Sequence, residues 1–266
     1  MPFFETNDSV SIFYTTAGDA SNPPILLIHG WCADSHDWSW QISLLSKNYY
    51  VIAFDLRGHG RSSAPEDVSY DVKTLIEDTA AVLRHLNILK NVIVIGHSMG
   101  GIVTSLFSIL KPEFVKAIVF IDPPAWTSAA VAQATLEALP HVPDMTALAL
   151  TIYGQLVQGA VPDWLKTWYF RRVEGMPVHV VRKTLEAFNS EGGLARKEEH
   201  VALVPKRKVP RLAVYIDQEK EELERGLGVG PLDEVTTIEG VGHWPHQVKS
   251  EEFNILLENW LKKIAS

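Results

Sequence analysis

The chain has 266 residues, of which 46% are hydrophobic and 21% are charged, the balance of a globular protein with a sizeable core. The formal net charge of -8 disfavours partners with phosphate backbones or anionic lipid surfaces. The longest apolar runs are too short to span a membrane, so we expect neither a nucleic-acid-binding nor a membrane protein. Cys32 has no second cysteine to pair with, and the first residues lack a secretory pattern; a cytoplasmic location is therefore expected.

Short apolar segments alternate with longer amphipathic ones along the chain. This alternation is typical of βαβ units on a mostly parallel sheet. We expect strands at residues 10–15, 25–29, 49–55, 92–96, 117–122, 211–216 and 235–238. Helices are expected at residues 38–45, 72–86, 100–110 and 256–264. The predicted fold class is therefore α/β, with helices flanking one sheet.

The segment from Trp126 to about Pro205 breaks this alternation. It favours helix, is rich in alanine, leucine and aromatic residues, and contains no convincing strand. We assign residues 1–124 and 206–266 to the core and residues 125–205 to a helical lid. Because a parallel sheet carries its functional loops at the carboxyl ends of the strands, a lid inserted after such a strand is expected to cover those loops.

A G-x-S-x-G motif, Gly96 to Gly100, follows an apolar strand and precedes a helical segment. A nucleophile on a sharp strand-to-helix turn needs glycines on both sides for backbone clearance. We therefore predict that Ser98 is a catalytic nucleophile. The alternative is a glycine-rich strand end with a helix-capping serine.

A second turn, His29-Gly30-Trp31, also follows an apolar strand. Together with the Ser98 motif it predicts an oxyanion hole made by the backbone N–H groups of Trp31 and Met99. The alternative is an ordinary turn closed by Gly30.

His243 lies on a glycine-flanked loop after the last predicted strand and before the C-terminal helix. It comes last in chain order, as the general base of a hydrolase triad does. His246 is the local alternative, but Pro245 separates it from the glycine loop. We expect most of the ten histidines to be structural or surface residues.

These motifs, together with the run from Asp55 to Ser62, resemble the α/β-hydrolase superfamily over nearly the whole chain outside the lid. The resemblance implies the α/β-hydrolase fold, with the lid after its sixth strand and a triad of serine, histidine and an acid. Four motifs in the correct order are specific for the fold and much less so for the chemistry.

The acid departs from the common pattern, which places an aspartate after the strand at residues 211–216. Here that position holds Asp217 and Glu219 within a charged run without glycine. The preceding strand ends in Asp122, followed by two prolines. This placement is similar to that in zearalenone-type lactone hydrolases and in cofactor-independent 3-hydroxy-4-quinolone dioxygenases. We therefore expect Asp122 to be the acid; Asp217 and Glu219 are alternatives, and Asp122 could instead cap the first lid helix.

Aromatic side chains of the lid and the oxyanion loop are candidates for substrate contact, because flat rings bind ring-bearing substrates and exclude water. The alternative for each is packing inside the lid or onto the core. The expected substrate-binding residues are Trp31, His97, Trp126, Tyr153, Trp164 and Trp168, with Phe170 also facing the pocket.

The residues favour a serine hydrolase that cleaves a carboxylic ester or lactone of a small organic molecule through an acyl-enzyme. The mechanism requires no cofactor or metal, the expected partner is a small-molecule substrate, and a homodimer is left open. One alternative is a cofactor-free dioxygenase in which His243 deprotonates a 3-hydroxy-4-quinolone-type ring. Met99 follows Ser98 directly and favours hydrolysis, because the dioxygenases that this chain resembles carry a histidine at that position. A non-catalytic binding protein on the same fold is the other alternative.

Overall fold

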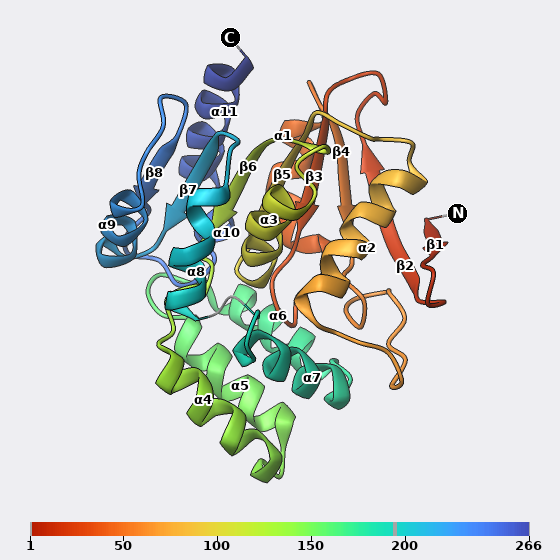
Figure 1. The fold of residues 1–266 in the computed structure, drawn as a ribbon, viewed down its shortest axis with the longest axis vertical. Helices are drawn as coiled ribbons and strands as arrows, with labels where there is room; N and C mark the ends of the chain where they lie inside the picture. Colours follow the sequence, from red (N-terminus) through yellow and green to blue (C-terminus); the bar gives the residue numbers. More distant parts are fainter. Residues whose placement is uncertain (1, 194–195, 266) are drawn as a thin grey trace.

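One eight-stranded sheet forms the centre of the molecule, in the computed structural model of residues 2–193 and 196–265 (Figure 1). Its strand order is β1-β2-β4-β3-β5-β6-β7-β8; β2 pairs antiparallel with β1 and β4, and all other pairs are parallel. The strands are β1 (Phe3–Glu5), β2 (Ser11–Ala17), β3 (Pro24–Ile28), β4 (Tyr50–Phe54), β5 (Val92–His97), β6 (Val115–Ile121), β7 (Arg211–Tyr215) and β8 (Glu234–Thr237). The predicted α/β-hydrolase fold is confirmed.

Helices cover both faces of the sheet, and alternate strand residues pack against them. In β3, Leu26 and Ile28 join the cluster of α2 (Val72–His85) and α3 (Met99–Leu110), while Ile25 and Leu27 join that of α11 (Ser250–Ala265) on the other face. Burial on both sides explains why the parallel strands are continuous apolar runs rather than alternating ones. The remaining core helices are η1 (Ser35–Trp38), α1 (Ser39–Leu45), α9 (Gln218–Gly226) and α10 (Pro245–Val248).

A helical insertion between β6 and β7 forms the cap, which is grouped at one end of the molecule in Figure 1. It consists of α4 (Ala129–Ala138), η2 (Leu139–His141), α5 (Met145–Leu156), α6 (Asp163–Glu174), α7 (Val178–Asn189), α8 (Lys197–Leu203) and η3 (Val204–Lys206). A third apolar cluster holds the middle of the cap together and includes Trp244 from the loop after β8. The cap therefore packs on the loops that follow the parallel strands, as expected of an insertion after the sixth strand.

The edge strand β1 and helix α9 are among the elements that the sequence did not predict. The edge strand β1 has three residues, too few for a period-two pattern to be recognised. Helix α9 begins in the charged run after β7, a composition typical of a solvent-exposed surface. Its Glu224 is nevertheless fully buried, with Oε1 2.8 Å from Nη2 of Arg207 and 2.8 Å from Nε of Arg211. The charges of this run are thus partly structural, because buried ions require partners.

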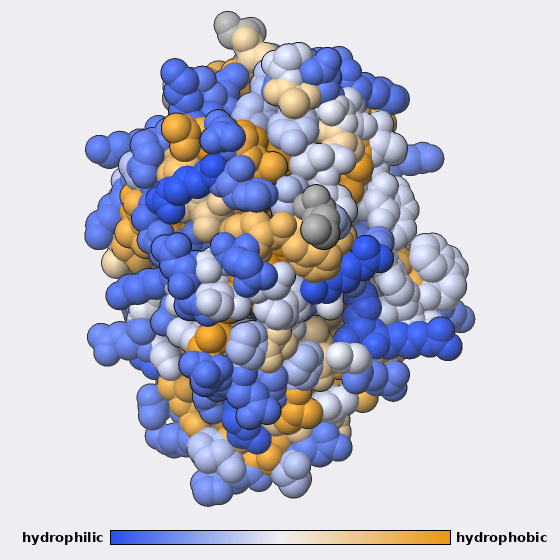
Figure 2. Space-filling view, turned by 90° about the vertical axis from the view of Figure 1, so that its right-hand side faces the viewer, coloured by the Kyte–Doolittle hydropathy of each residue, from blue (hydrophilic) through white to orange (hydrophobic). Residues whose placement is uncertain are grey.

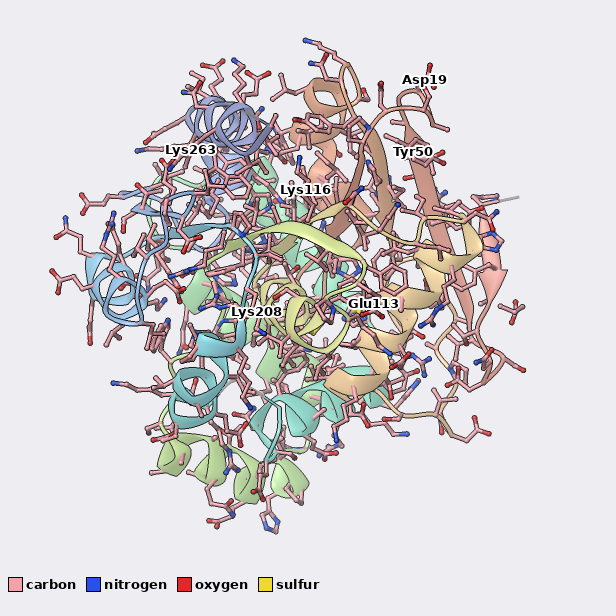
Figure 3. The ribbon with its side chains drawn as sticks, turned by 45° about the horizontal axis from the view of Figure 1, so that its top comes forward. Asp19, Tyr50, Glu113, Lys116, Lys208 and Lys263 are labelled. Carbon is pink, nitrogen blue, oxygen red and sulfur yellow. The ribbon has the colours of Figure 1, made fainter. Side chains whose placement is uncertain are left out.

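The surface shown in Figure 2 is mostly hydrophilic, with apolar side chains in smaller groups between charged ones. Charged residues such as Asp19, Lys116 and Lys263 lie at the end of the molecule away from the cap (Figure 3). Among residues 2–193 and 196–265, none of the helices combines the length and apolar character that crossing a membrane requires.

Helix α3 approaches the sheet so closely that a glycine is needed at its second position. A Cβ on Gly100 would lie 2.2 Å from the carbonyl oxygen of Ile28 and 2.5 Å from that of His29. We predict that Gly100→Ala lowers the free energy of unfolding in urea by roughly 1–3 kcal/mol or more, because a backbone atom must move to admit the methyl group.

Gly154 in α5 is the matched control, since a Cβ there meets no atom within 4 Å. Gly154→Ala is expected to raise the free energy of unfolding by about 0.5–1 kcal/mol through helix propensity. Equal stabilities of the two variants would contradict the close approach of α3.

Candidate active site

Ser98 lies in the turn between β5 and α3, with φ 53° and ψ -120°. Such a conformation is strained for a residue with a Cβ and costs about 1–3 kcal/mol, so the surroundings must impose it. The N–H of Ser98 donates to the carbonyl of Ile121 on β6 at 2.8 Å, and the close packing of α3 fixes the other side of the turn. A nucleophile in this turn stands at the carboxyl end of the sheet, beside the positive end of the α3 dipole.

The loop after β3 lies directly against this turn. A Cβ on Gly30 would lie 3.2 Å from the Cβ of Ser98, which shows how closely the two segments approach. Within the part of the chain that the structure describes, the N–H groups of Trp31 and Met99 donate to no protein acceptor. Both predicted oxyanion donors therefore have their hydrogens available for a ligand.

The cap holds the oxyanion loop through Trp31. The indole Nε1 of Trp31 donates to Oγ1 of Thr184 on α7 at 2.8 Å, and its carbonyl accepts a hydrogen bond from the hydroxyl of Tyr153 on α5. Because the cap binds the indole N–H and the backbone carbonyl of Trp31, the position of its backbone N–H depends on the cap helices.

His243 and Asp122 form a buried contact. Nδ1 of His243 lies 2.6 Å from Oδ2 of Asp122, and the two residues are 5% and 2% exposed. Asp122 follows β6 with φ 42°, and its N–H donates to the carbonyl of Val214 on β7 at 2.7 Å. The left-handed turn and this hydrogen bond hold the carboxylate at the tip of β6.

The two alternative acids lie elsewhere. Asp217 caps α9, with Oδ1 accepting from the N–H of Lys220 at 2.9 Å, and Glu219 is exposed to solvent. Neither makes a hydrogen bond or ion pair with His243 in the described ranges. The structure thus brings Asp122, rather than Asp217 or Glu219, to the histidine.

Lys220 is a second partner of Asp122 that the sequence did not reveal. Its Nζ lies 3.2 Å from Oδ1 of Asp122 and 3.1 Å from Oδ2 of Asp217. Burial alone would raise the pKa of Asp122, but the hydrogen bond from His243 and the charge of Lys220 outweigh it, and the pKa lies below its ordinary value. The carboxylate is therefore ionised and has a partner on each oxygen.

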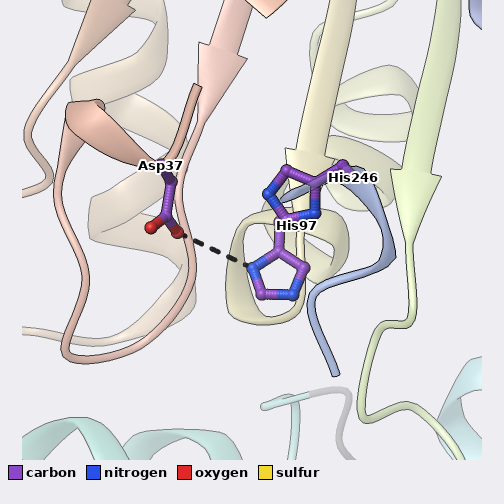
Figure 4. A group of neighbouring side chains, drawn as sticks. All are labelled: Asp37, His97 and His246. Carbon is purple, nitrogen blue, oxygen red and sulfur yellow. Dashed lines mark ion pairs between the residues drawn. The ribbon is translucent and has the colours of Figure 1, made fainter. Parts of the chain in front are cut away.

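His97, expected to contact substrate, is buried, and its ring centroid lies 4.7 Å from that of His243. Figure 4 shows it between Asp37 and His246. Its Nε2 lies 2.7 Å from the carbonyl oxygen of His243, and since a carbonyl only accepts, Nε2 is the donor. Its Nδ1 faces Oδ2 of Asp37 at 3.8 Å. Burial and the neighbouring His246 and His243 hold the pKa of His97 far below its ordinary value. This placement fits support of the His243 backbone better than contact with substrate.

Donor atoms of Asp37, His97 and His246 lie within 4.8 Å of one another, a set of residue types that binds divalent metals. However, Nη2 of Arg172 lies 2.6 Å from Oδ1 of Asp37, and the guanidinium already neutralises this carboxylate. Adding a dication beside a buried arginine would leave a large uncompensated charge. The cluster is thus electrostatically unsuited to a metal ion and better suited to joining the cap to the core.

Helix α6 of the cap is joined to the core through two buried polar contacts. Besides the Arg172–Asp37 ion pair, the hydroxyl of Tyr169 donates to Oε1 of Gln247 at 2.8 Å, and Nε2 of Gln247 donates to the carbonyl of Asp37 at 3.1 Å. No sequence motif indicates these pairs, because their members are 78 to 210 positions apart.

The predicted aromatic residues occupy different environments. Tyr153 is buried, with its ring centroid 6.2 Å from that of Trp31 and 5.3 Å from that of Trp244. Trp164 is 62% exposed. The other three are partly buried: Trp126 packs on the core and against His200, whereas Trp168 and Phe170 pack within the cap cluster. Their contact with substrate stays a prediction.

Known proteins resemble this chain in sequence and in structure. A non-heme chloroperoxidase from Burkholderia pyrrocinia is 42% identical over 102 residues, 38% of this chain and 36% of that protein. A putative esterase/lipase from Haemophilus influenzae is 35% identical over 128 residues, 45% and 44% of the two chains. The chain therefore spans less than half the length of these curated relatives.

Solved structures match over nearly the whole chain. An esterase from Thermogutta terrifontis has a TM-score of 0.83 at 20% identity, covering 100% of this chain and 98% of the other. The enol-lactonase from Burkholderia xenovorans has a TM-score of 0.80 at 20% identity, covering 98% and 100%. At this identity the likeness shows the fold alone.

A family profile described as the alpha/beta hydrolase fold matches residues 23–162, which include the Ser98 turn and the oxyanion loop. With the sheet order, the strained serine and the carboxyl-end position of the cap, this match decides the family. The chain belongs to the α/β-hydrolase fold family.

Proposed function

We propose that the protein is a serine hydrolase that cleaves a carboxylic ester or lactone of a small, ring-bearing molecule through an acyl-enzyme. The observation that carries the proposal is the contact between His243 Nδ1 and Asp122, 2.6 Å long and buried, at the end of a strand whose neighbour β5 leads into Ser98 in a strained strand-to-helix turn. Because Asp122 binds Nδ1, the imidazole keeps Nε2 for proton exchange with Ser98.

In the proposed reaction, Nε2 of His243 takes the proton of the Ser98 hydroxyl while the oxygen attacks the carbonyl carbon. The N–H groups of Trp31 and Met99 stabilise the resulting oxyanion. The intermediate collapses, the alkoxy group leaves with the proton from His243, and the acyl group stays on Ser98. A water molecule, deprotonated by His243, then releases the acid and restores the serine.

Asp122 serves this cycle by orientation and charge. Its carboxylate fixes the tautomer of His243 and stabilises the imidazolium that forms when the serine proton is transferred. All steps use side chains and backbone groups of this chain plus water. The reaction as proposed needs no cofactor.

The enclosure of the site supports a small substrate. Ser98 is 8% exposed and His243 is 5% exposed, and the N–H of His243 donates to the carbonyl of Leu156 on α5 at 3.0 Å, so the reacting carbonyl must reach groups that the cap helps to bury. The rings of Trp31 and Tyr153 lie at the junction of the oxyanion loop and the cap, which supports a flat, ring-bearing acyl or alcohol group. The esterase and the enol-lactonase of similar fold are consistent with this substrate class.

We predict that Ser98→Ala lowers turnover of p-nitrophenyl esters and of lactones by at least about 10⁴-fold, because the attacking oxygen is removed. Acid release at constant pH measures the loss. Ser105→Ala, on the same helix, is the control and should turn over at nearly the wild-type rate.

Substantial acid release by Ser98→Ala would contradict the hydrolase proposal. Oxygen uptake with 3-hydroxy-4-quinolones that survives this substitution would instead indicate the dioxygenase reaction. Saturable ligand binding without any turnover by the wild type would indicate a binding protein.

We predict that Asp122→Asn lowers kcat on the order of 10³- to 10⁴-fold, because the amide preserves the shape but favours the wrong tautomer of His243. Glu219→Gln is the control and should leave kcat unchanged, since Glu219 is exposed. Steady-state kinetics on one ester measures both variants. A comparable loss in Glu219→Gln or Asp217→Asn, with Asp122→Asn active, would overturn the assignment of the acid.

A further inference from the structure

The loop after β7 is where the common pattern of this family places the triad acid, and in this chain it supplies a cation to the acid instead. Asp122 stands on the neighbouring strand β6, and Lys220, from the first turn of α9, reaches across to it. The lysine side chain is 31% exposed, whereas that of Asp122 is 2% exposed. The contact is thus open to water on the lysine side only.

Helix α9 holds Lys220 in place at both its backbone and its ammonium group. Oδ1 of Asp217 accepts from the N–H of Lys220, and Oδ2 of Asp217 lies 3.1 Å from Nζ. The hydroxyl of Thr237 on β8 donates to Oε2 of Glu221 at 2.6 Å and lies 3.3 Å from the carbonyl oxygen of Asp217, which ties the start of α9 to the sheet. Because these contacts already restrict the side chain of Lys220, its ion pair with Asp122 costs less side-chain entropy than an ordinary surface ion pair does.

The two oxygens of Asp122 are divided between a catalytic and a non-catalytic partner. Oδ2 lies 2.6 Å from Nδ1 of His243, and Oδ1 lies 3.2 Å from Nζ of Lys220. We propose that Lys220 is a positioning residue that fixes the Asp122 carboxylate and limits how strongly it favours a proton on His243. The proposal rests on the proposed function in taking His243 as the general base.

The direction of the effect follows from charge. A cation in contact with Asp122 disfavours a second positive charge on the imidazole that the same carboxylate binds. The contacts with Asp122 and Asp217 also hold the pKa of Lys220 above its ordinary value although burial alone would lower it, and the lysine remains charged.

The ring of His97 packs on that of His243, and three further titratable or charged groups follow from His97 through successive contacts. His97 ends β5, His246 lies on α10, Asp37 on η1 and Arg172 on α6, in addition to Asp122 after β6 and Lys220 on α9. The charge of Arg172 is matched by Asp37, while burial and the charge of His243 hold the pKa of His246 at about 3. Of the cations in this set, Lys220 contacts the triad acid.

The test is the pH dependence of kcat/KM for one activated ester, measured on the full chain. Lys220→Met is expected to move the acidic limb of the profile about 0.5–1 pH unit higher, a shift reduced by the partial exposure of the lysine. Lys220→Arg should restore the wild-type limb because it keeps the charge. Partial unfolding would lower the profile at every pH in this range rather than displace its limb.

Lys249→Met is the matched control, since Lys249 is a half-exposed lysine 3.3 Å from Glu252 and away from the triad. Its profile should superimpose on that of the wild type. An unmoved limb in Lys220→Met, or an equal displacement in Lys249→Met, would overturn the role of Lys220.

A titration without substrate separates this inference from the proposed function. The Nδ1 proton of a histidine bound to a carboxylate gives a resolved proton NMR signal, identified here by its absence from His243→Gln. The pH midpoint of the change in this signal should be higher in Lys220→Met than in the wild type. Lys220→Arg should have the wild-type midpoint. If the wild type lacks Ser98-dependent turnover, the function fails while this titration still decides on Lys220; an unmoved midpoint overturns the inference in either case.

Discussion

The close contact of helix α3 with strands β3 and β5 is the constraint on which the site depends. Gly96 and Gly100 let the helix approach until a Cβ at either position would come within 2.2 Å of backbone carbonyl oxygens. That approach leaves no room for a relaxed connection, and the strain falls on Ser98, whose φ is 53°. The packing energy of the core thus holds Ser98 in a conformation it would not adopt alone.

The position of the acid follows from the pairing of β6 and β7. The N–H of Asp122 donates to the carbonyl of Val214, so the tips of the two strands meet at the same height in the sheet. Either strand can therefore present a carboxylate to a histidine on the loop after β8. Here Asp122, directly after β6, binds His243, and the segment after β7 forms the capped start of α9.

The sequence was sufficient for the features that depend on local backbone rules. The glycines around Ser98, the loop of His243 and the prolines after Asp122 all indicate turns at strand ends, and the structure has turns there. It was insufficient for contacts made by long side chains across the fold. Lys220 lies 98 positions from Asp122, and nothing in the charged run distinguishes its contacts from solvent.

The cap shows the same limit. Its helical character was evident from composition, but the direction of each ring depends on how the helices pack against one another. Tyr153 is buried at the loop after β3 and Trp164 is 62% exposed, although both are aromatic residues on cap helices. The apolar residues of α5 and α6 are spread too evenly around each helix for the sequence to say which side faces the core.

The buried pair of Arg172 and Asp37 bears on how this enzyme class diversifies. Exchanging the cap of this chain for another would be one way to change what the site binds. A cap without an arginine at the position of Arg172 would leave the fully buried Asp37 without its ion-pair partner. The free energy of unfolding would fall by about 3–5 kcal/mol. The core therefore accepts only caps that carry a matching cation, unless Asp37 is replaced at the same time. In this lineage, cap and core are expected to change together.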